Sequence, residues 1–188
     1  MKALRLAIAA LMLASCAAPT LVGTQITPTA APDFTLTDGI SGKPITLSAQ
    51  RGKVVVLSFL YTHCPDVCPL TAEQFRMAQQ KLTDTERDRT LFVAVSVDPL
   101  QDTPQAVQAF ARDHGLATNF VFLIGGAAQL QPVWQAYGIR IETDQMTFVG
   151  HSDAIYLLDG KGQARVLTHS DITAEALAGD VKLLAAGR

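Results

Sequence analysis

Charge is sparse in this sequence, and neither sign gathers in a block. Lys and Arg together number 15 and Asp and Glu 17, which leaves a formal net charge of −2. A nucleic-acid-binding surface needs clustered basic residues, so this distribution excludes nucleic acid as a partner. Internal repeats are also absent, and 188 residues are enough for one domain with a full core but too few for two. We therefore expect a single globular domain.

An apolar run long enough to cross a membrane is missing too. Residues 6–14 are all apolar, but these nine residues rise only about 14 Å as a helix, against a bilayer core of roughly 30 Å. Lys2 and Arg5 precede this run, which is typical of a signal peptide. The run ends in Leu-Ala-Ser-Cys at Cys16, which resembles the lipobox of bacterial lipoproteins. We therefore expect a lipoprotein signal peptide at 1–15 and lipidation at Cys16, with an ordinary signal peptide as the alternative.

A lipidated Cys16 would anchor the chain on the periplasmic side of a bacterial membrane. Residues 16–32 contain three prolines and no charged side chain, a composition that favours a flexible tether. The globular domain is then expected at 33–188.

Two cysteines remain in the expected domain, Cys64 and Cys68. A disulfide between them would close a very small loop, and the stabilisation from a disulfide grows with loop length. A structural disulfide is therefore a poor explanation for the pair. We expect these two sulfurs to carry chemistry instead.

The hydrophobic pattern predicts an α/β domain with a mixed central sheet flanked by helices. Apolar, β-branched runs predict buried strands, and apolar residues at helical spacing behind a proline or a threonine predict helices. Strands are expected at 54–60, 91–97 and 120–124, hairpins at 34–47 and 154–167, and helices from 69, at 103–113, 127–137 and 173–186.

The string YTHCPDVCPL at 61–70 lies between an expected central strand and an expected helix. Sites of open α/β sheets occur at this position, and the N–H groups at a helix N-terminus lower the pKa of a thiol. Thiolates select soft ions, and two of them leave a tetrahedral or trigonal ion incomplete. The chain offers four histidines as a third ligand, at positions 63, 114, 151 and 169, and their spacing does not choose among them.

Three blocks in this order resemble the SCO/SenC family. They are the cysteine string, Ser-Val-Asp-Pro at 96–99 with Asp-Thr-Pro at 102–104, and His-Ser at 151–152 before Ile-Tyr-Leu at 155–157. The resemblance implies a thioredoxin-like fold and copper, as Cu(I), Cu(II) or both, bound by Cys64, Cys68 and His151. It further implies work on the binuclear copper centre of cytochrome c oxidase. The implied partners are a copper-receiving oxidase subunit and another periplasmic copper carrier.

An enzymatic function remains as the alternative. In a membrane-tethered thiol–disulfide reductase, Cys64 would attack a target disulfide and Cys68 would resolve the mixed disulfide. Thioredoxin-like reductases usually carry CxxC and a proline opposite it, whereas this chain has CxxxC and a histidine at the matching place. These differences favour metal binding without excluding thiol exchange.

Overall fold

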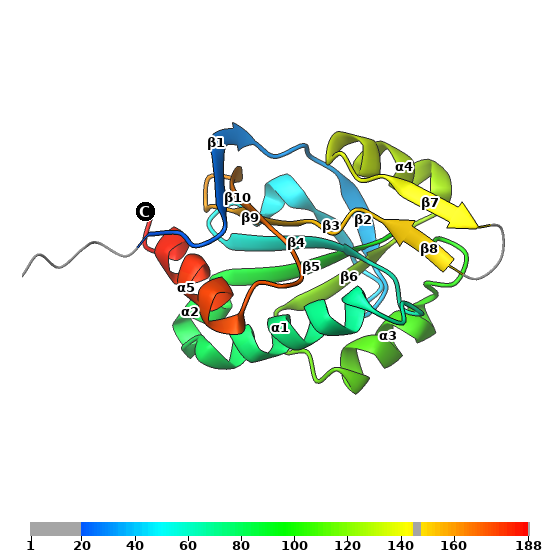
Figure 1. The fold of residues 1–188 in the computed structure, drawn as a ribbon, viewed down its shortest axis with the longest axis horizontal. Coiled ribbons are helices and arrows are strands. Elements are labelled where there is room, and N and C mark those ends of the chain that lie inside the picture. Colours follow the sequence, from blue (N-terminus) through cyan, green and yellow to red (C-terminus); the bar gives the residue numbers. More distant parts are fainter. Residues whose placement is uncertain (1–19, 145–147, 188) are drawn as a thin grey trace, which may run out of the picture.

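The computed structural model describes residues 20–144 and 148–187. Eight strands form one sheet in the order β1-β10-β9-β4-β5-β6-β2-β3, and β7 and β8 form a separate two-stranded sheet (Figure 1). The strands are β1 Thr24–Ala30, β2 Thr35–Asp38, β3 Pro44–Thr46, β4 Val54–Leu60, β5 Thr90–Ser96, β6 Phe120–Ile124, β7 Ile141–Asp144, β8 Phe148–His151, β9 Ile155–Leu158 and β10 Gln163–Thr168. The helices are α1 Val67–Lys81, α2 Asp84–Asp88, α3 Pro104–Asp113, α4 Ala127–Ala136 and α5 Ala174–Ala185, with a 3₁₀ turn at Leu47–Gln50.

The sheet is mixed, as the sequence predicts. Strand β4 runs parallel to β5, and β5 runs parallel to β6, whereas the other pairs in the sheet are antiparallel. All seven residues of β4 and all seven of β5 are buried, because helices cover both faces of the sheet at these strands. This is a thioredoxin-like arrangement, and the predicted fold class is confirmed.

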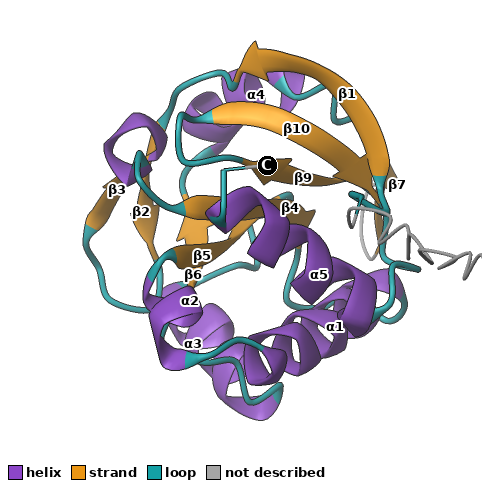
Figure 2. Ribbon diagram, turned by 90° about the vertical axis from the view of Figure 1, so that its left-hand side faces the viewer, coloured by secondary structure: helices purple, strands orange, loops and turns teal. Residues whose placement is uncertain are grey.

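Aromatic side chains tie the two helical layers to the central strands. Helices α1, α3 and α5 lie on one side of the sheet and α4 on the other (Figure 2). On the first side the rings of Phe75 and Phe92 lie 5.1 Å apart, which joins α1 to β5. On the other side the ring of Phe59 in β4 packs against that of Tyr137, which follows α4, with 5.6 Å between ring centroids. The core therefore holds the carboxyl end of β4, and the loop after it, between two packed layers.

Part of the segment 16–32, which the sequence predicts to be a flexible tether, is instead a strand. Residues 24–30 form β1, which pairs antiparallel with β10 from Thr24 opposite Leu167 to Ala30 opposite Gln163. Six of the seven side chains of β1 are exposed, so the sequence has no alternating apolar pattern there. Backbone hydrogen bonds to the edge of the sheet hold this strand instead.

Helix α2 and the β7–β8 hairpin are not predicted from the sequence pattern, and α1 begins at Val67 rather than at the predicted Pro69. Residues 1–19, including the expected signal peptide and Cys16, lie outside the described residues. Among the residues that are described, no helix combines the length and the apolar character needed to cross a membrane.

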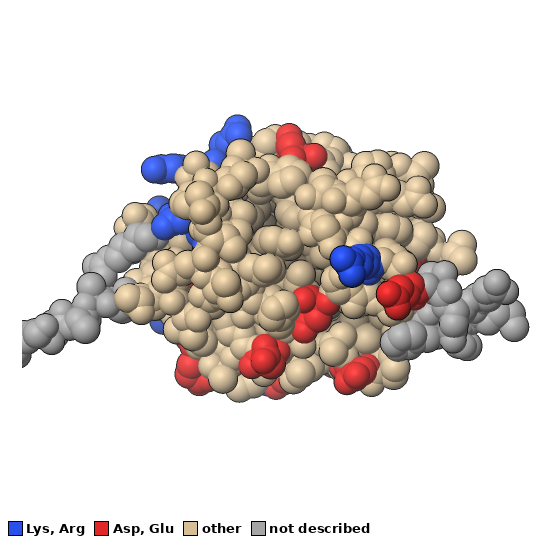
Figure 3. Space-filling model, turned by 45° about the horizontal axis from the view of Figure 1, so that its top comes forward, with Lys and Arg blue, Asp and Glu red and all other residues tan. Residues whose placement is uncertain are grey.

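Charged side chains are distributed unevenly over the face in Figure 3. Lys and Arg gather toward the end where the described chain begins, and Asp and Glu lie mainly along the lower margin of this view (Figure 3). Much of the face between them carries no charged side chain. Neither sign therefore covers this face as a continuous patch.

Candidate metal centre

The two cysteines lie where the chain passes from β4 into α1. Cys68 belongs to the first turn of α1, and its backbone N–H donates a hydrogen bond to Cys64 Sγ over 3.4 Å. Both residues are free cysteines. They are also deeply placed, since Cys64 is 9 % exposed and Cys68 is fully buried. The sequence-predicted pair thus forms one compact unit at a helix N-terminus.

A buried carboxylate holds the loop before Cys64 in place. Asp102 Oδ1 accepts hydrogen bonds from the Thr62 backbone N–H and the Thr62 hydroxyl, each over 2.8 Å. Its second oxygen accepts the Ser96 hydroxyl at 2.6 Å. Burial raises the pKa of Asp102 above its ordinary value, against the hydrogen bonds that favour its ionised form. Asp102 therefore joins the cysteine loop to the end of β5.

The two thiols differ strongly in acidity. The pKa of Cys64 is lowered to about 5, chiefly because the Cys68 side chain donates a hydrogen bond to its sulfur. Backbone N–H groups of Asp66 and Cys68 and the Tyr61 side chain add to this effect, against the cost of burial. The same contact with Cys64, together with burial and the nearby Asp102 charge, raises the pKa of Cys68. At neutral pH the pair consists of one thiolate and one thiol.

His151 reaches this pair from the other end of the sequence. It ends β8, and its Nε2 lies 3.9 Å from Cys68 Sγ. Its Nδ1 lies 3.0 Å from the backbone oxygen of Ser152. Since a carbonyl oxygen only accepts, Nδ1 must carry the proton in that hydrogen bond, and in the neutral ring Nε2 then presents a lone pair to Cys68. This is the tautomer that a metal ligand needs.

The ring of Tyr61 and the hydrogen bonds at the base of the β7–β8 hairpin orient the imidazole. The ring of Tyr61 meets that of His151 edge-on, with 5.9 Å between centroids and 81° between planes. The backbone N–H of Ser152 donates to the Arg140 carbonyl, and the Arg140 N–H donates to the Ser152 hydroxyl, just before β7. The β7–β8 hairpin therefore fixes the position from which His151 faces the cysteines.

The distance between Cys68 and His151 suits a shared ion. Metal–sulfur and metal–nitrogen bonds of about 2.3 and 2.0 Å place the two donor atoms about 3.6 Å apart at angles between tetrahedral and trigonal. The observed 3.9 Å is close to that separation. In the described part of the chain, however, no three His, Cys, Asp or Glu side chains form a complete ion site. The donors thus meet pairwise, and an ion would have to draw all three together.

The other three histidines have different surroundings. His63 is exposed, and its Nδ1 contacts the Thr62 hydroxyl at 3.0 Å. His114 follows α3 and packs against Phe110 with its ring tilted by 50° and 4.5 Å between ring centroids. His169 is exposed and bonds through Nδ1 to the backbone oxygen of Asp153. Only His151 among the four is brought to a cysteine sulfur by a contact between the described residues.

Sequence reasoning missed the part that Asp102 plays. Asp102 stands in one of the blocks that carry the family resemblance, but no local pattern shows that its carboxylate reaches Thr62, 40 residues earlier. Tyr61 was likewise not recognised as a neighbour of both Cys64 and His151. Its position at the start of the cysteine string was the only available signal.

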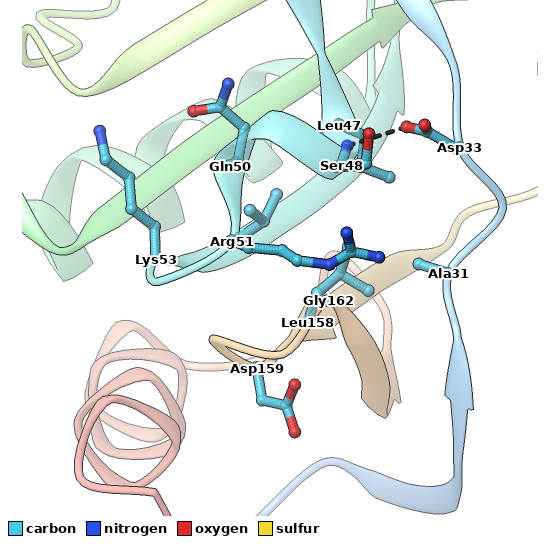
Figure 4. A pocket seen from close by; sticks show the side chains of 11 residues that line it. Ala31, Asp33, Leu47, Ser48, Gln50, Arg51, Lys53, Leu158, Asp159 and Gly162 are labelled. Carbon is cyan, nitrogen blue, oxygen red and sulfur yellow. Dashed lines mark hydrogen bonds between the residues drawn. The ribbon is translucent and has the colours of Figure 1, made fainter.

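A small cavity of about 90 Å³ lies at the opposite end of β4 from the cysteines. Its lining includes Lys53, Val55, Asp33 and Asp159. Figure 4 shows the Arg51 side chain extending across it, while Gln50 and Lys53 point away. The cavity has no connection with the cysteine loop, so we do not assign it to the same site.

Comparison with known proteins places this geometry in a family. The SCO1/SenC family model matches residues 23–186. The chain belongs to the SCO1/SenC family. Over 136 residues it is 32 % identical to the mitochondrial protein SCO2 of Saccharomyces cerevisiae, an alignment that covers 69 % of this chain and 44 % of the yeast protein. This SCO1/SenC chain thus spans less than half of that relative.

Solved structures agree with the assignment. The apo Sco1 protein of Thermus thermophilus has a TM-score of 0.77 and 28 % identity to this chain, and the match covers 88 % of this chain and 97 % of the other. The copper-bound ScoI of Bradyrhizobium japonicum has a TM-score of 0.69 and 28 % identity, covering 83 % and 99 %. The predicted family is confirmed, and relatives of this SCO1/SenC protein include one whose structure contains copper.

Proposed function

We propose that this SCO1/SenC protein binds one copper ion through Cys64, Cys68 and His151 and delivers it to the binuclear copper centre of cytochrome c oxidase. One observation carries the proposal: His151 Nε2, which holds the lone pair in the tautomer fixed by Ser152, lies 3.9 Å from Cys68 Sγ. The donors come from segments 83 residues apart, and metal binding accounts for their meeting.

The donor set favours copper over harder ions. Two cysteine sulfurs and one imidazole suit Cu(I) and Zn²⁺ but not Mg²⁺ or Ca²⁺, and a copper-bound relative supports copper. The Cys64 thiolate is ready to bind at neutral pH, and the Cys68 thiol would lose its proton to the solvent when the ion arrives. Because three separate ligands hold the ion, a recipient can replace them one at a time.

The proposed location follows from the N-terminus. Lipidation at Cys16 would hold the domain on the periplasmic side of a bacterial membrane, where the recipient oxidase subunit and a further copper carrier are accessible. Residues 16–21 would then act as the tether, since the backbone N–H groups of Val22 and Gly23 are bound by Asp180 and β1 begins at Thr24.

A copper titration of the reduced full chain tests the proposal. We expect one ion per chain, and we expect His151→Ala to weaken binding by more than the roughly 10- to 100-fold that loss of an outer-shell partner costs. His169→Ala is the matched control, because His169 is exposed and bonds elsewhere. Equal affinity of the His151→Ala and His169→Ala variants would refute the assigned third ligand.

The acidity of Cys64 favours a second candidate, thiol–disulfide exchange. Its thiolate would attack a target disulfide, forming a mixed disulfide and releasing one target thiolate. Cys68, after losing its proton, would then attack Cys64 Sγ, releasing the second target thiolate and leaving a Cys64–Cys68 disulfide. Two electrons pass to the target, and an external thiol reductant must restore the pair. Reduction of an oxidised target peptide, measured with and without bound copper, tests this candidate.

A further inference from the structure

The loop after β5 presents a leucine to the solvent. Leu100 is 89 % exposed, the highest value among the large apolar side chains that are exposed in the described chain. The loop around it is firmly built, because Asp98 Oδ1 accepts the backbone N–H groups of Leu100 and Gln101 at 3.1 and 3.2 Å. The Gln101 side chain also donates to Asp98 Oδ2 at 2.9 Å. Leu100 is therefore held outward on an ordered turn.

A single exposed leucine is ordinary, so its position must carry the argument. In the described chain three large apolar residues are exposed: Val22, Leu70 and Leu100. Two of them lie on the segments that carry or support the cysteine loop. Leu70 is 44 % exposed and follows Cys68 by two residues. Leu100 precedes, by two residues, the Asp102 carboxylate that holds Thr62.

Because Cys64 and Cys68 are buried, the surface around them decides how closely a copper acceptor can approach. Metal–ligand bonds are about 2.0–2.3 Å long, so an acceptor's ligand must come within bonding distance of an ion held by Cys64 and Cys68. With these side chains 9 % and 0 % exposed, the acceptor's surface must press against the loops around them. Leu100 and Leu70 are the exposed large apolar side chains that the described chain carries on these segments.

We propose that Leu100 and Leu70 form a docking surface for the copper-accepting domain of the oxidase subunit. This inference rests on the proposed function. Apolar side chains at the centre of an interface contribute most of its binding energy when they are desolvated. The surface we name consists of the exposed side chains of Leu100 and Leu70.

A protein partner fits the surface of Leu100 and Leu70 better than a lipid surface does. Anionic membranes attract Lys and Arg, and residues 61–75 and 97–103 contain neither. Asp66 is exposed and Glu73 half-buried in these segments, so the charge that they present to the solvent is negative, whereas Asp98 and Asp102 are buried. In addition, the described chain begins beside α5, whereas the β7–β8 hairpin that bears His151 lies at the other end of the molecule (Figure 1). A membrane-tethered N-terminus would therefore emerge far from this surface.

The test compares copper transfer by full-length variants loaded with Cu(I). Leu100→Ser removes the apolar side chain from the docking surface, and Val22→Ser is the matched control, because Val22 is 68 % exposed at the opposite end of the chain. The acceptors are the apo copper domain of the oxidase subunit and a small Cu(I) chelator, bicinchoninate. We expect Leu100→Ser to slow transfer to the protein domain about tenfold, with copper affinity and transfer to the chelator unchanged.

Each other outcome overturns a distinct part of the account. If the wild-type chain binds no copper, the proposed function fails. If it binds copper but transfers none to the oxidase domain, the delivery part of the proposed function fails. If Leu100→Ser and Val22→Ser transfer equally fast, the docking inference alone is refuted. If Leu100→Ser instead lowers binding to vesicles of phosphatidylethanolamine and phosphatidylglycerol while transfer is unchanged, the surface contacts the membrane and the proposed occupant is wrong.

Discussion

At the scale of single residues, proton positions prepare the site for a soft ion. Ser152 fixes the proton of His151 on Nδ1, and this leaves Nε2 to face Cys68. Cys64 carries the negative charge of the thiol pair, and Cys68 keeps its proton through the hydrogen bond to Cys64. A thiolate and a thiol therefore lie together in a buried place, and the imidazole of the half-buried His151 faces the thiol. Copper binding would release a single proton from this arrangement near neutral pH.

The acidity of Cys64 gives a prediction for alkylation by iodoacetamide. Because the thiolate is the reactive form and the pKa is about 5, Cys64 should react at a nearly constant rate above pH 6 and slow as the pH falls through 5. Removal of the largest cause, in Cys68→Ala, should move this midpoint upward. Mass spectrometry of the modified residue measures the rate at each pH. A midpoint that stays in place in Cys68→Ala would contradict the assigned cause.

At the scale of elements, the site depends on how the end of β5 supports the end of β4. The backbone N–H of Val97 donates to the Leu60 carbonyl, and Asp102 continues this connection to Thr62. Helix α3 begins two residues after Asp102, with the Thr103 side chain accepting the Ala106 N–H. The cysteine loop is therefore supported by a second loop that is itself ordered.

Asp102→Ala tests this support. It would leave the Thr62 N–H, the Thr62 hydroxyl and the Ser96 hydroxyl without their acceptor, and we expect unfolding free energy to fall by about 2 to 4 kcal/mol. Asp113→Ala is the control, because the Arg112–Asp113 ion pair is exposed and contributes little. Urea denaturation followed by circular dichroism measures both. A loss below about 0.5 kcal/mol for Asp102→Ala would contradict the role given to this carboxylate.

The elements also show what the sequence can predict. The central strands were predictable because β4 and β5 are buried throughout, which leaves continuous apolar runs. Strand β1 was not, because its exposed side chains carry no pattern. At the site, the spacing of Cys64 and Cys68 identified the sulfurs, whereas His151 was chosen by family resemblance. Its approach to Cys68 depends on the β7–β8 hairpin, which no local pattern revealed.

At the scale of the whole molecule, the two chain ends are joined at the end away from the candidate site. Asp180 of α5 is fully buried, and its two carboxylate oxygens accept the backbone N–H groups of Val22 and Gly23 at 2.8 and 3.1 Å. With Cys16 lipidated, as we propose, only residues 16–21 separate the membrane from the anchored part of the chain, a reach of about 21 Å at most. The domain would then stay near the membrane with its cysteines directed away from it.

Asp180→Ala tests how β1 is held. Two backbone N–H groups would lose their acceptor, so we expect a loss of about 2 kcal/mol in stability and faster amide exchange in Thr24–Ala30. Exchange in β4 should change far less, because β4 lies in the centre of the sheet. Hydrogen–deuterium exchange with mass spectrometry measures both segments. Unchanged exchange in β1 would show that pairing with β10 suffices to hold it.

The most direct test of the central claim is X-ray absorption spectroscopy of the full chain loaded with one equivalent of Cu(I). The account predicts a single copper environment with two sulfur ligands and one nitrogen ligand, and loss of the nitrogen contribution in His151→Ala. A spectrum with fewer than two sulfur ligands, or one that is identical in His151→Ala, would contradict it.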